Sequence, residues 1–285
     1  MEREQYAVMA RREEHHWWYA GMRRVALSVL DHALAGQSGL LILDAGCGTG
    51  GTTVRLRRYG RVVGLDLVWE ALRPAADRGL DGHLVRGSVE RLPFPAAAFD
   101  VATSFEVVYH LGVASDELAL AELRRVLKPS GLLLLRVPAH DWLRGAHDRL
   151  VHTRHRYSRA EVAAKLARAG FAVEQLSWAN SLLFPAAAAK RLLEPPAEGA
   201  RAAIDANAAT QAAEPTTPAA VHSSSGGGTG AQRPGDDHAA EPDLWQPPEP
   251  LNALLESLVA VEALALPRGI GLPFGLSVLA LARAT

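Results

Sequence analysis

The stretch LLILDAGCGTGGTTVRL, residues 40–56, joins a run of branched apolar residues to an acidic residue and a cluster of glycines. A short continuous apolar run predicts a buried strand, here residues 40–44. The glycines that follow let the backbone turn tightly and let a ligand approach main-chain N–H groups, because no Cβ is in the way. We therefore expect a strand that ends at Asp44 and opens into a binding loop containing Gly46, Gly48, Gly50 and Gly51.

Strands and helices alternate along the rest of the chain. We expect further strands at 61–67, 82–88, 98–105, 131–139, 171–179 and 276–284, and helices at 2–19, 21–35, from the glycines to Tyr59, 69–78, 116–127 and 158–170. The last of these helices has Ser158 as its N-cap and Glu161 three residues later, which is the capping-box spacing. Short apolar strands alternating with helices predict a doubly wound α/β domain with a mostly parallel sheet.

Composition limits the partners that the chain can have. Thirty basic and 31 acidic residues leave a formal charge of -1, so no global field attracts nucleic acid or an anionic membrane. Cys47 is the only cysteine, which excludes an internal disulfide and a multi-cysteine zinc site. The charged, aromatic beginning of the sequence has no signal-peptide pattern, so we expect a cytoplasmic location. The apolar stretch 251–266 contains two glutamates and predicts a buried or lid helix rather than a membrane span.

Composition also divides the chain into four parts. We expect a helical lid over 1–37, a core domain over 38–194, a disordered low-complexity insertion over 195–247, and a helix with the final strand over 248–285. The insertion is rich in Ala, Pro, Ser, Gly and Thr and contains SSSGGGTG, so it has little apolar material for a core.

The glycine loop by itself fits two kinds of cofactor. Gly46, Gly48 and Gly51 satisfy the dinucleotide pattern G-x-G-x-x-G, and Asp66 lies at a suitable distance to hold a ribose. A carboxylate at the mouth of the loop would repel a pyrophosphate, whereas it would favour a ligand with an ammonium and a sulfonium group. Asp44 therefore favours S-adenosylmethionine over a nicotinamide dinucleotide. The structural alternatives are a helix N-cap for Asp44 and a turn residue for Asp66.

Four motifs in order resemble those of the class I S-adenosylmethionine-dependent methyltransferases, in particular the small-molecule branch of quinone biosynthesis. They are LDAGCGTG, VVGLDL, GSVERLPFPAAAFDVATSFEVVYHL and AELRRVLKPSGLLLLRVP, within residues 38–180. The resemblance implies a Rossmann-like seven-stranded sheet whose last strand is antiparallel and lies next to the sixth. It also implies S-adenosyl-L-methionine as cofactor.

The resemblance places the cofactor on named residues. Asp44, Gly46, Cys47 and Gly48 would line the methionine moiety, and Asp66 with Leu67 would hold the ribose. Ser88, Val89 and Glu90 would flank the adenine, and Ser104 and Phe105 would face the carboxylate and the methyl-transfer region. Ser88 is a departure, since the family commonly has an acidic residue there, but a hydroxyl can also accept the adenine hydrogen bond.

EVVYHL, residues 106–111, follows the fourth expected strand and lies over the expected methyl position. Ubiquinone-type O-methyltransferases have E-V-L-E-H in a similar place, where two glutamates and a histidine hold a metal. Tyr109 replaces the second glutamate here, so we expect no metal. We predict that His110, beside Tyr109, acts as a base or hydrogen-bonds the acceptor; the alternative is a histidine that packs the next helix.

Two other segments supply candidate acceptor-binding residues. Trp18 and Tyr19, in HHWWY, could cover the site or only pack on the sheet. Arg154, Arg156 and Tyr157 could bind an anionic acceptor, or the loop that holds them could be a solvated basic cover. Histidines and aspartates in 140–155 suggest a metal site, but the five arginines within 140–159 would repel the ion.

The sequence therefore predicts a methyltransferase that acts on a small-molecule acceptor, lipophilic or anionic. The alternatives are an NAD-dependent oxidoreductase and a non-catalytic cofactor-binding scaffold. We expect no nucleic-acid partner. The apolar segments 181–193 and 251–266 could form a movable cap with peripheral membrane or lipid contact, or could simply cover one face of the sheet. The sequence does not predict the oligomeric state.

Overall fold

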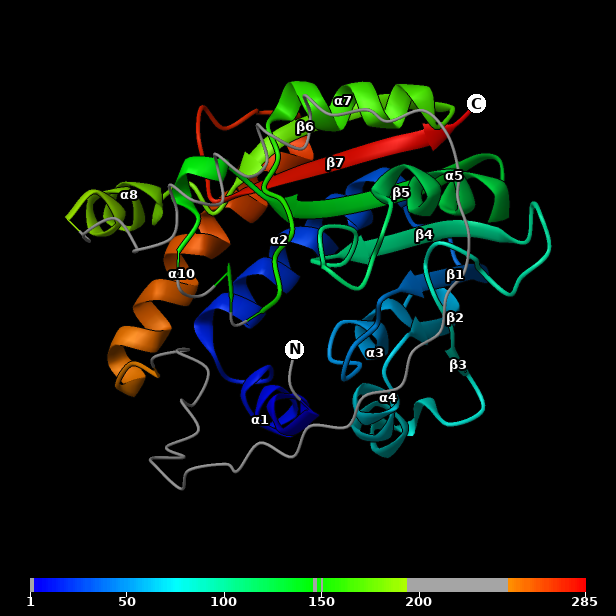
Figure 1. Ribbon diagram of the computed structural model, residues 1–285, viewed down its shortest axis with the longest axis horizontal. Helices are drawn as coiled ribbons and strands as arrows, with labels where there is room; N and C mark the ends of the chain where they lie inside the picture. The colour runs from blue at the N-terminus through cyan, green and yellow to red at the C-terminus, as the bar shows by residue number, and fades with distance from the viewer. Residues whose placement is uncertain (1–2, 146–147, 150, 194–245) are drawn as a thin grey trace, which may run out of the picture.

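The computed structural model describes residues 3–145, 148–149, 151–193 and 246–285. These residues form one seven-stranded sheet in the order β3-β2-β1-β4-β5-β7-β6, with helices on both faces (Figure 1). The strands are β1 Leu40–Ala45, β2 Gly60–Asp66, β3 Leu84–Arg86, β4 Phe99–Phe105, β5 Leu127–Pro138, β6 Phe171–Ala179 and β7 Ser277–Ala284. The first five strands pair in parallel, and β7 lies between β5 and β6, antiparallel to both. The predicted fold is confirmed.

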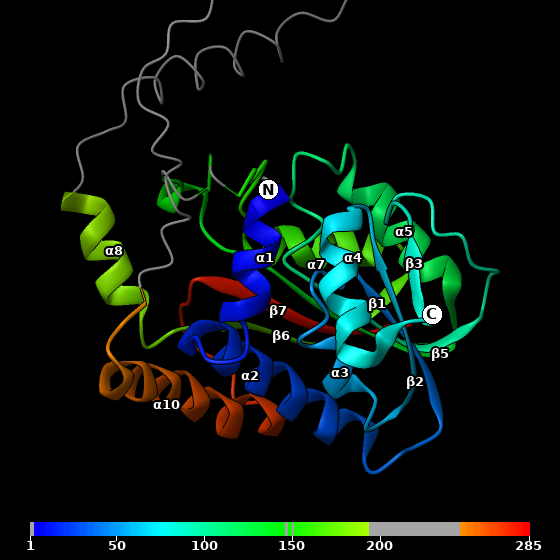
Figure 2. The same ribbon diagram turned by 90° about the horizontal axis from the view of Figure 1, so that it is seen from below.

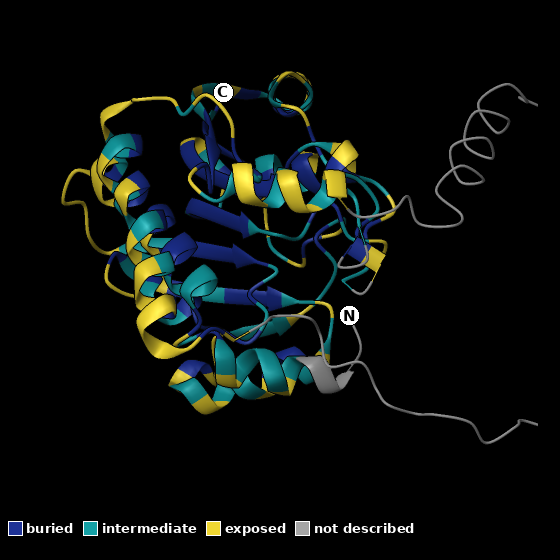
Figure 3. Ribbon diagram, turned by 90° about the vertical axis from the view of Figure 1, so that its left-hand side faces the viewer, coloured by how far each residue is buried: buried dark blue, intermediate teal, exposed yellow. Residues whose placement is uncertain are grey.

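Two apolar layers cover the sheet. On one face α5 and α7 pack on the strands, and on the other face α2, α3 and α10 do so. Figure 3 shows the buried strands between helices whose outer sides are exposed. The helices are α1 Arg3–Arg12, α2 Trp17–Leu34, α3 Thr53–Leu56, α4 Trp69–Ala75, η1 Ala76–Leu80, α5 Asp116–Val126, η2 Asp141–Leu143, α7 Arg159–Arg168, α8 Phe184–Leu193, α10 Glu249–Ala265 and η3 Leu266–Arg268.

The strand order reverses between β1 and β4, which both leave the sheet at the same edge. In open α/β sheets the connecting loops diverge at such a point, so a crevice forms at the carboxyl ends of the two strands. The glycine loop after β1 and the segment after β4 meet at this edge. The topology therefore places both predicted motifs at one site.

The beginning of the chain differs from the prediction. The expected helix over 2–19 ends at Arg12, and a second helix begins at Trp17. His16 caps this second helix, because its Nδ1 accepts a hydrogen bond from the Trp18 amide at 3.3 Å. The tryptophans therefore lie in the first turn of α2. The helix after the glycines is also shorter than expected and covers only Thr53–Leu56.

Helix α10 is tied to both α2 and the end of β6, and it runs beside α2 (Figure 2). Gly21 lets the helices approach closely, because a Cβ there would lie 2.8 Å from Cβ of Val259. Glu262 is buried and accepts the amide hydrogens of Asn180 and Ser181 at 2.7 and 2.5 Å. By length and composition alone, the helical stretch Glu249–Arg268 could cross a membrane. In the structure, 28% of its apolar 18-residue part is buried.

These contacts make α10 a part of the outer layer of the fold. The expected buried or lid helix at 251–266 is thus a helix with one buried and one exposed side. The predicted disordered insertion at 195–247 lies almost entirely outside the described residues, so it stays a prediction.

Candidate cofactor and acceptor site

The glycine loop contains three residues with positive φ, Gly46, Gly48 and Gly50. Gly46 has φ +87°, and a Cβ at this position would lie 2.1 Å from Cγ2 of Val107. Gly48 has φ +54°, and its amide donates a hydrogen bond to Oδ2 of Asp66 at 2.9 Å. A side chain at Gly46 would clash and be strained, so this position requires glycine. The loop after β1 is thereby tied to the end of β2.

Asp66 lies where the prediction placed the ribose acceptor. Its Oδ1 accepts the Val68 amide at 3.0 Å, while Oδ2 accepts the Gly48 amide. Burial raises the pKa of this carboxyl, and the backbone hydrogen bonds act in the opposite direction. A carboxylate has about four lone-pair sites, so the group keeps capacity to accept hydroxyl hydrogen bonds at the edge of the sheet.

The side chain of Asp44 is buried and hydrogen-bonded within the protein, so it is not open to direct contact with a ligand. It is 2% exposed, and its two oxygens accept hydrogen bonds from Thr53 Oγ1 at 2.6 Å and Thr103 Oγ1 at 2.8 Å. Burial raises the pKa of this carboxyl and the two threonine hydroxyls lower it. Asp44 therefore joins β1 to α3 and β4, and its charge can act on a ligand through the low-dielectric interior. Direct contact with the methionine moiety stays a prediction.

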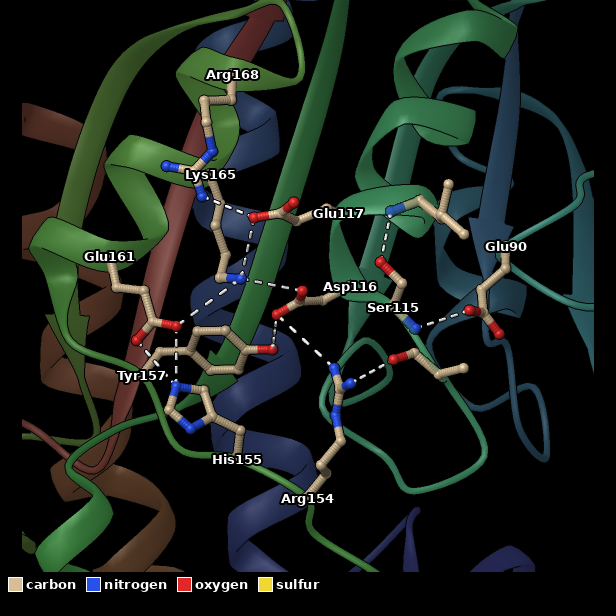
Figure 4. A network of polar contacts seen from close by, with 12 residues as sticks. Glu90, Ser115, Asp116, Glu117, Arg154, His155, Tyr157, Glu161, Lys165 and Arg168 are labelled. Carbon is tan, nitrogen blue, oxygen red and sulfur yellow. Dashed lines mark hydrogen bonds and ion pairs between the residues drawn. The ribbon is translucent and has the colours of Figure 1, made fainter. Parts of the chain in front are cut away.

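The predicted adenine-binding residues form a local turn. Oγ of Ser88 accepts the Glu90 amide at 3.2 Å, and Val89 is buried. Oε1 of Glu90 accepts the Ser115 amide at 2.8 Å, so this carboxylate fixes the start of α5 (Figure 4). Leu67 is 48% exposed at the end of β2 and offers an apolar surface beside the loop.

Three observations fit S-adenosylmethionine at this edge. The Gly46–Gly48 loop leaves backbone room for a ligand, and Asp66 offers acceptors for hydroxyl groups. Ser104, at the end of β4, is fully buried, and its Oγ has no hydrogen-bond partner among the residues that the structure describes. A buried orphan hydroxyl calls for an explanation, and a polar group of a bound cofactor would supply the missing partner. Cys47, packed against Gly64, is buried, and burial raises the pKa of its thiol, so it adds no charge to the site.

Helix α1 lies over the glycine loop. The methyl carbon of Met9 is 3.1 Å from where a Cβ on Gly48 would be, and Thr49 Oγ1 donates to Glu13 at 2.7 Å. Arg78 in η1 contacts both Glu13 and Glu14, at 2.7 and 2.6 Å. These contacts hold α1 against the glycine loop, and its role as a lid stays a prediction.

The sequence did not single out an ion pair at the ends of β4 and β5. Arg136 Nε donates to Glu106 Oε1 at 2.9 Å, and its guanidinium lies 5.4 Å from the ring centre of Trp18 and 5.2 Å from that of Phe105. The signal that could have found it is a single arginine inside the apolar run LLLLRVP. A buried charge in such a run requires a specific partner.

The aromatic residues around this pair were partly predicted. The ring of Trp18 lies beside the Arg136 guanidinium. Burial raises the pKa of Tyr19, and the nearby carboxylates of Glu13 and Glu106 raise it further. Tyr109 is 6% exposed, and burial followed by Glu106 raises the pKa of its hydroxyl well above the ordinary value. The structure thus brings Trp18, Tyr19, Phe105 and Tyr109 to one place.

His110 stacks on Tyr109, with ring centres 4.8 Å apart. Burial lowers the pKa of His110 to about 4, and nearby positive charge, including His152, adds to the effect. The imidazole is therefore neutral at pH 7 and can accept a hydrogen bond, although its low pKa makes it a weak base. The base role stays a prediction.

The predicted anion-binding donors are engaged by the protein, as Figure 4 shows for Arg154 and Tyr157. Tyr157 donates its hydroxyl to Asp116 at 2.7 Å, and Arg154 Nη1 donates to the Ala114 carbonyl at 2.6 Å. Arg156 forms a two-pronged contact with Asp148, at 2.7 and 3.1 Å. Arg154 and Tyr157 thereby fasten their loop to the start of α5, whereas the pair of Arg156 and Asp148 lies within the loop. Binding of an acceptor by these residues stays a prediction, and it requires some of these contacts to open.

In the described part of the chain, no group of three or more His, Cys, Asp or Glu side chains could hold a metal ion. His155, one of the histidines that suggested a metal, instead lies 2.9 Å from both carboxylate oxygens of Glu161.

Comparison with known proteins agrees with this geometry. Residues 43–135 match the family model described as a methyltransferase domain. A malonyl-[acyl-carrier protein] O-methyltransferase of Erwinia pyrifoliae is 41% identical over 113 residues, which are 39% of this chain and 42% of that protein. A probable S-adenosylmethionine-dependent methyltransferase of Mycolicibacterium smegmatis is 31% identical over 166 residues, 57% of this chain and 62% of that protein. The chain thus spans about half the length of the curated relatives it matches.

Solved structures show the same fold at low identity. A putative methyltransferase in complex with the Haloferax volcanii Trm112 activator has a TM-score of 0.53 and 22% identity, covering 99% of this chain and 96% of that one. The [4+2]-cyclase SpnF has a TM-score of 0.52 and 19% identity, covering 92% of this chain and 81% of that one. These likenesses show the fold alone.

The fold, the glycine loop with Asp66 and the family match define the class. The chain contains a class I methyltransferase domain, and the cofactor of this class is S-adenosyl-L-methionine.

Proposed function

We propose that this protein transfers the methyl group of S-adenosylmethionine to a small-molecule acceptor. The observation that carries the proposal is the tie between the two motifs: the Gly48 amide donates to Asp66 at the carboxyl edge of β1 and β2. The names of several relatives, the malonyl-[acyl-carrier protein] O-methyltransferases, support a small or carrier-bound acceptor. Membership of the quinone-biosynthesis branch is part of the same proposal. It rests on the sequence motifs and not on the relatives named above.

The cofactor supplies an electrophilic methyl group on a sulfonium, which is already a good leaving group. The protein has mainly to bind, align and exclude water. Asp66 and the glycine loop would hold the adenosyl part, and Met9 and Tyr6 on α1 would cover it. Trp18, Phe105 and Tyr109 would form the walls on the acceptor side.

The charge of the crevice distinguishes S-adenosylmethionine from NAD as the cofactor. A pyrophosphate of NAD would meet Asp44 and Asp66 in a buried setting, where like charges repel strongly. A cationic sulfonium meets the same carboxylates favourably. A non-catalytic scaffold would keep cofactor binding without methyl transfer.

Contact with lipid is a further part of the proposal. Nine of the 14 large apolar side chains that are exposed among the described residues lie within 181–193 and 249–274. They include Leu192 and Leu193 on α8, which are 77% and 85% exposed. Concentrations of exposed apolar side chains mark interaction sites. We expect the protein to pellet with phospholipid vesicles; if it stays in the supernatant, this part of the proposal is wrong.

Calorimetry with S-adenosylhomocysteine and with NAD tests the cofactor. S-adenosylhomocysteine should bind and NAD should not. Asp66→Asn should weaken binding by roughly tenfold or more, because hydrogen bonds to a charged group contribute about 1.5–3 kcal/mol. Asp81→Asn, in an exposed turn near the same strands, is the matched control and should leave the affinity unchanged. Binding of NAD alone would overturn the proposal, and binding without any methylated product would favour the scaffold.

A further inference from the structure

Arg136 stands out because a buried arginine lies at the acceptor side of the crevice. Its neighbours Leu135 and Val137 pack on the α5 side of the sheet, whereas Leu134 packs on the α2 side. Side chains alternate along a strand, so Arg136 is directed to the α2 side. There its guanidinium lies over the rings of Trp18 and Phe105, and 8% of its side chain is exposed.

The hydrogen bonds of Arg136 are incomplete. Nε donates to Glu106 at 2.9 Å and Nη1 donates to the Met22 carbonyl at 3.3 Å. Nη2 donates no hydrogen bond to any residue that the structure describes, and it is not among the fully buried polar atoms that lack a partner. Nη2 of the guanidinium therefore remains able to donate to an acceptor atom of a ligand.

Glu106 holds the arginine in this position through an unusual backbone. Its φ of +59° lies in the left-handed region, which a glutamate rarely adopts, and its amide donates to the Arg136 carbonyl at 3.0 Å. Non-glycine residues in this region concentrate at functional sites. This backbone directs the Glu106 carboxylate onto Nε of Arg136. The ion pair therefore does not use Nη2.

The chemistry of this arrangement favours a carboxylate ligand. A guanidinium is planar, always charged and matches a carboxylate with two parallel donors, and here it lies within 5.4 Å of two aromatic ring centres. The nearby groups that titrate are unsuited to removing a proton at neutral pH. The pKa of His110 is lowered to about 4, and those of Tyr19 and Tyr109 are raised by burial. A carboxylate needs no base, since it is already ionised at pH 7.

We infer that Arg136 binds a carboxylate of the acceptor and that this carboxylate is the group that is methylated. The inference rests on the proposed methyl transfer. A carboxylate oxygen forms a bond to the methyl carbon, the bond from that carbon to sulfur breaks, and sulfur keeps the electron pair. The products are a methyl ester and S-adenosylhomocysteine, and no proton is transferred.

The test uses methyl-labelled S-adenosylmethionine and a metabolite extract as acceptor source. Label that mild alkali releases as methanol identifies a methyl ester. We expect this fraction to dominate with the wild-type protein and to fall about tenfold or more in Arg136→Met and Arg136→Lys, since lysine keeps the charge but not the two-donor edge. Arg159→Met is the matched control, because Arg159 also lies over an indole, that of Trp178, at 5.2 Å.

Loss of Arg136 leaves the partly buried Glu106 without its partner, which can destabilise the protein. The double variant Glu106→Gln, Arg136→Met removes both charges, and it should melt near the wild-type temperature while still losing ester formation. Alkali-stable product that is unaffected by Arg136→Met would overturn the inference and leave the proposed function standing. The absence of any labelled product would overturn both.

The cofactor also has a carboxylate, on its methionine part. Calorimetry with S-adenosylhomocysteine and 5′-methylthioadenosine, which lacks that carboxylate, separates the two sources. We expect both affinities to change less than about twofold in Arg136→Met. A tenfold loss for S-adenosylhomocysteine alone would assign Arg136 to the cofactor and overturn its role for the acceptor.

Discussion

At the scale of single residues, Asp44 and Asp66 end neighbouring strands but meet different partners. Two hydroxyls occupy the oxygens of Asp44, whereas backbone amides hold Asp66. A hydroxyl can turn its hydrogen away, but an amide in a loop is fixed, so Asp66 is held in one position before a ligand arrives. Such preorganisation lowers the cost of binding.

His110 gives a pH prediction at this scale. Its pKa is about 4 in the folded protein, compared with about 6.5 in an unfolded chain. Between these values the unfolded state binds a proton that the folded state does not, so stability should fall as the pH drops from about 6.5 to 4. His110→Gln removes this contribution. Urea unfolding at pH 7 and pH 4.5 should show a smaller loss for the variant; equal losses would contradict the buried, neutral histidine.

At the scale of elements, α1 is held on the domain mainly by charged contacts. Arg78 donates to Glu13, Glu14 and the carbonyls of Thr49 and Ala10, all between 2.6 and 2.9 Å. These contacts join η1, the glycine loop and α1. Because they are polar and partly exposed, α1 can detach more easily than a helix packed in the apolar core.

We predict that Arg78→Met speeds the release of S-adenosylhomocysteine roughly threefold to tenfold, corresponding to about 1 kcal/mol. Stopped-flow fluorescence measures the rate, since Trp17 and Trp18 lie just after this helix. Arg58→Met is the control, because Arg58 pairs with Asp31 on α2 at 3.0 Å. If both variants release the ligand at the wild-type rate, α1 does not limit cofactor exchange.

At the scale of the whole molecule, the last strand completes the sheet between two earlier ones. β7 pairs with β5 from Leu132 to Pro138 and with β6 from Phe171 to Ala179. β6 has no other partner in the described sheet, so its attachment depends on β7. Strands β6 and β7 should therefore unfold together with the rest of the sheet.

Leu279→Ala tests this dependence. Leu279 is 2% exposed, and removing its side chain should cost about 2–5 kcal/mol of unfolding free energy. Circular dichroism and tryptophan fluorescence should report one shared transition in urea. Leu118→Ala, at a position that is 57% exposed, should leave the midpoint almost unchanged. Separate transitions for the two signals would show that β6 and β7 unfold independently.

Local patterns in the sequence determined much of the architecture. The apolar runs predicted the strands, and the Ser158 hydroxyl does accept the Glu161 amide, as the capping-box spacing required. Glycines after the first strand predicted the loop, and Gly46 and Gly48 have the positive φ values that make glycine necessary. These features depend on neighbours in the chain, so the sequence contains them directly.

Contacts between distant residues were decided by the tertiary structure alone. The sequence predicted a strand with Asp44 at its end but could not show that Thr53 and Thr103 donate hydrogen bonds to the oxygens of Asp44. It predicted separate helices over 2–19 and 21–35 but could not place the break between α1 and α2 at residues 13–16, because the turn at His16 depends on packing. Arg136 was hidden for the same reason, since its partners Trp18 and Glu106 come from other elements. Such contacts depend on how the strands are ordered in space, which periodicity along the chain does not encode.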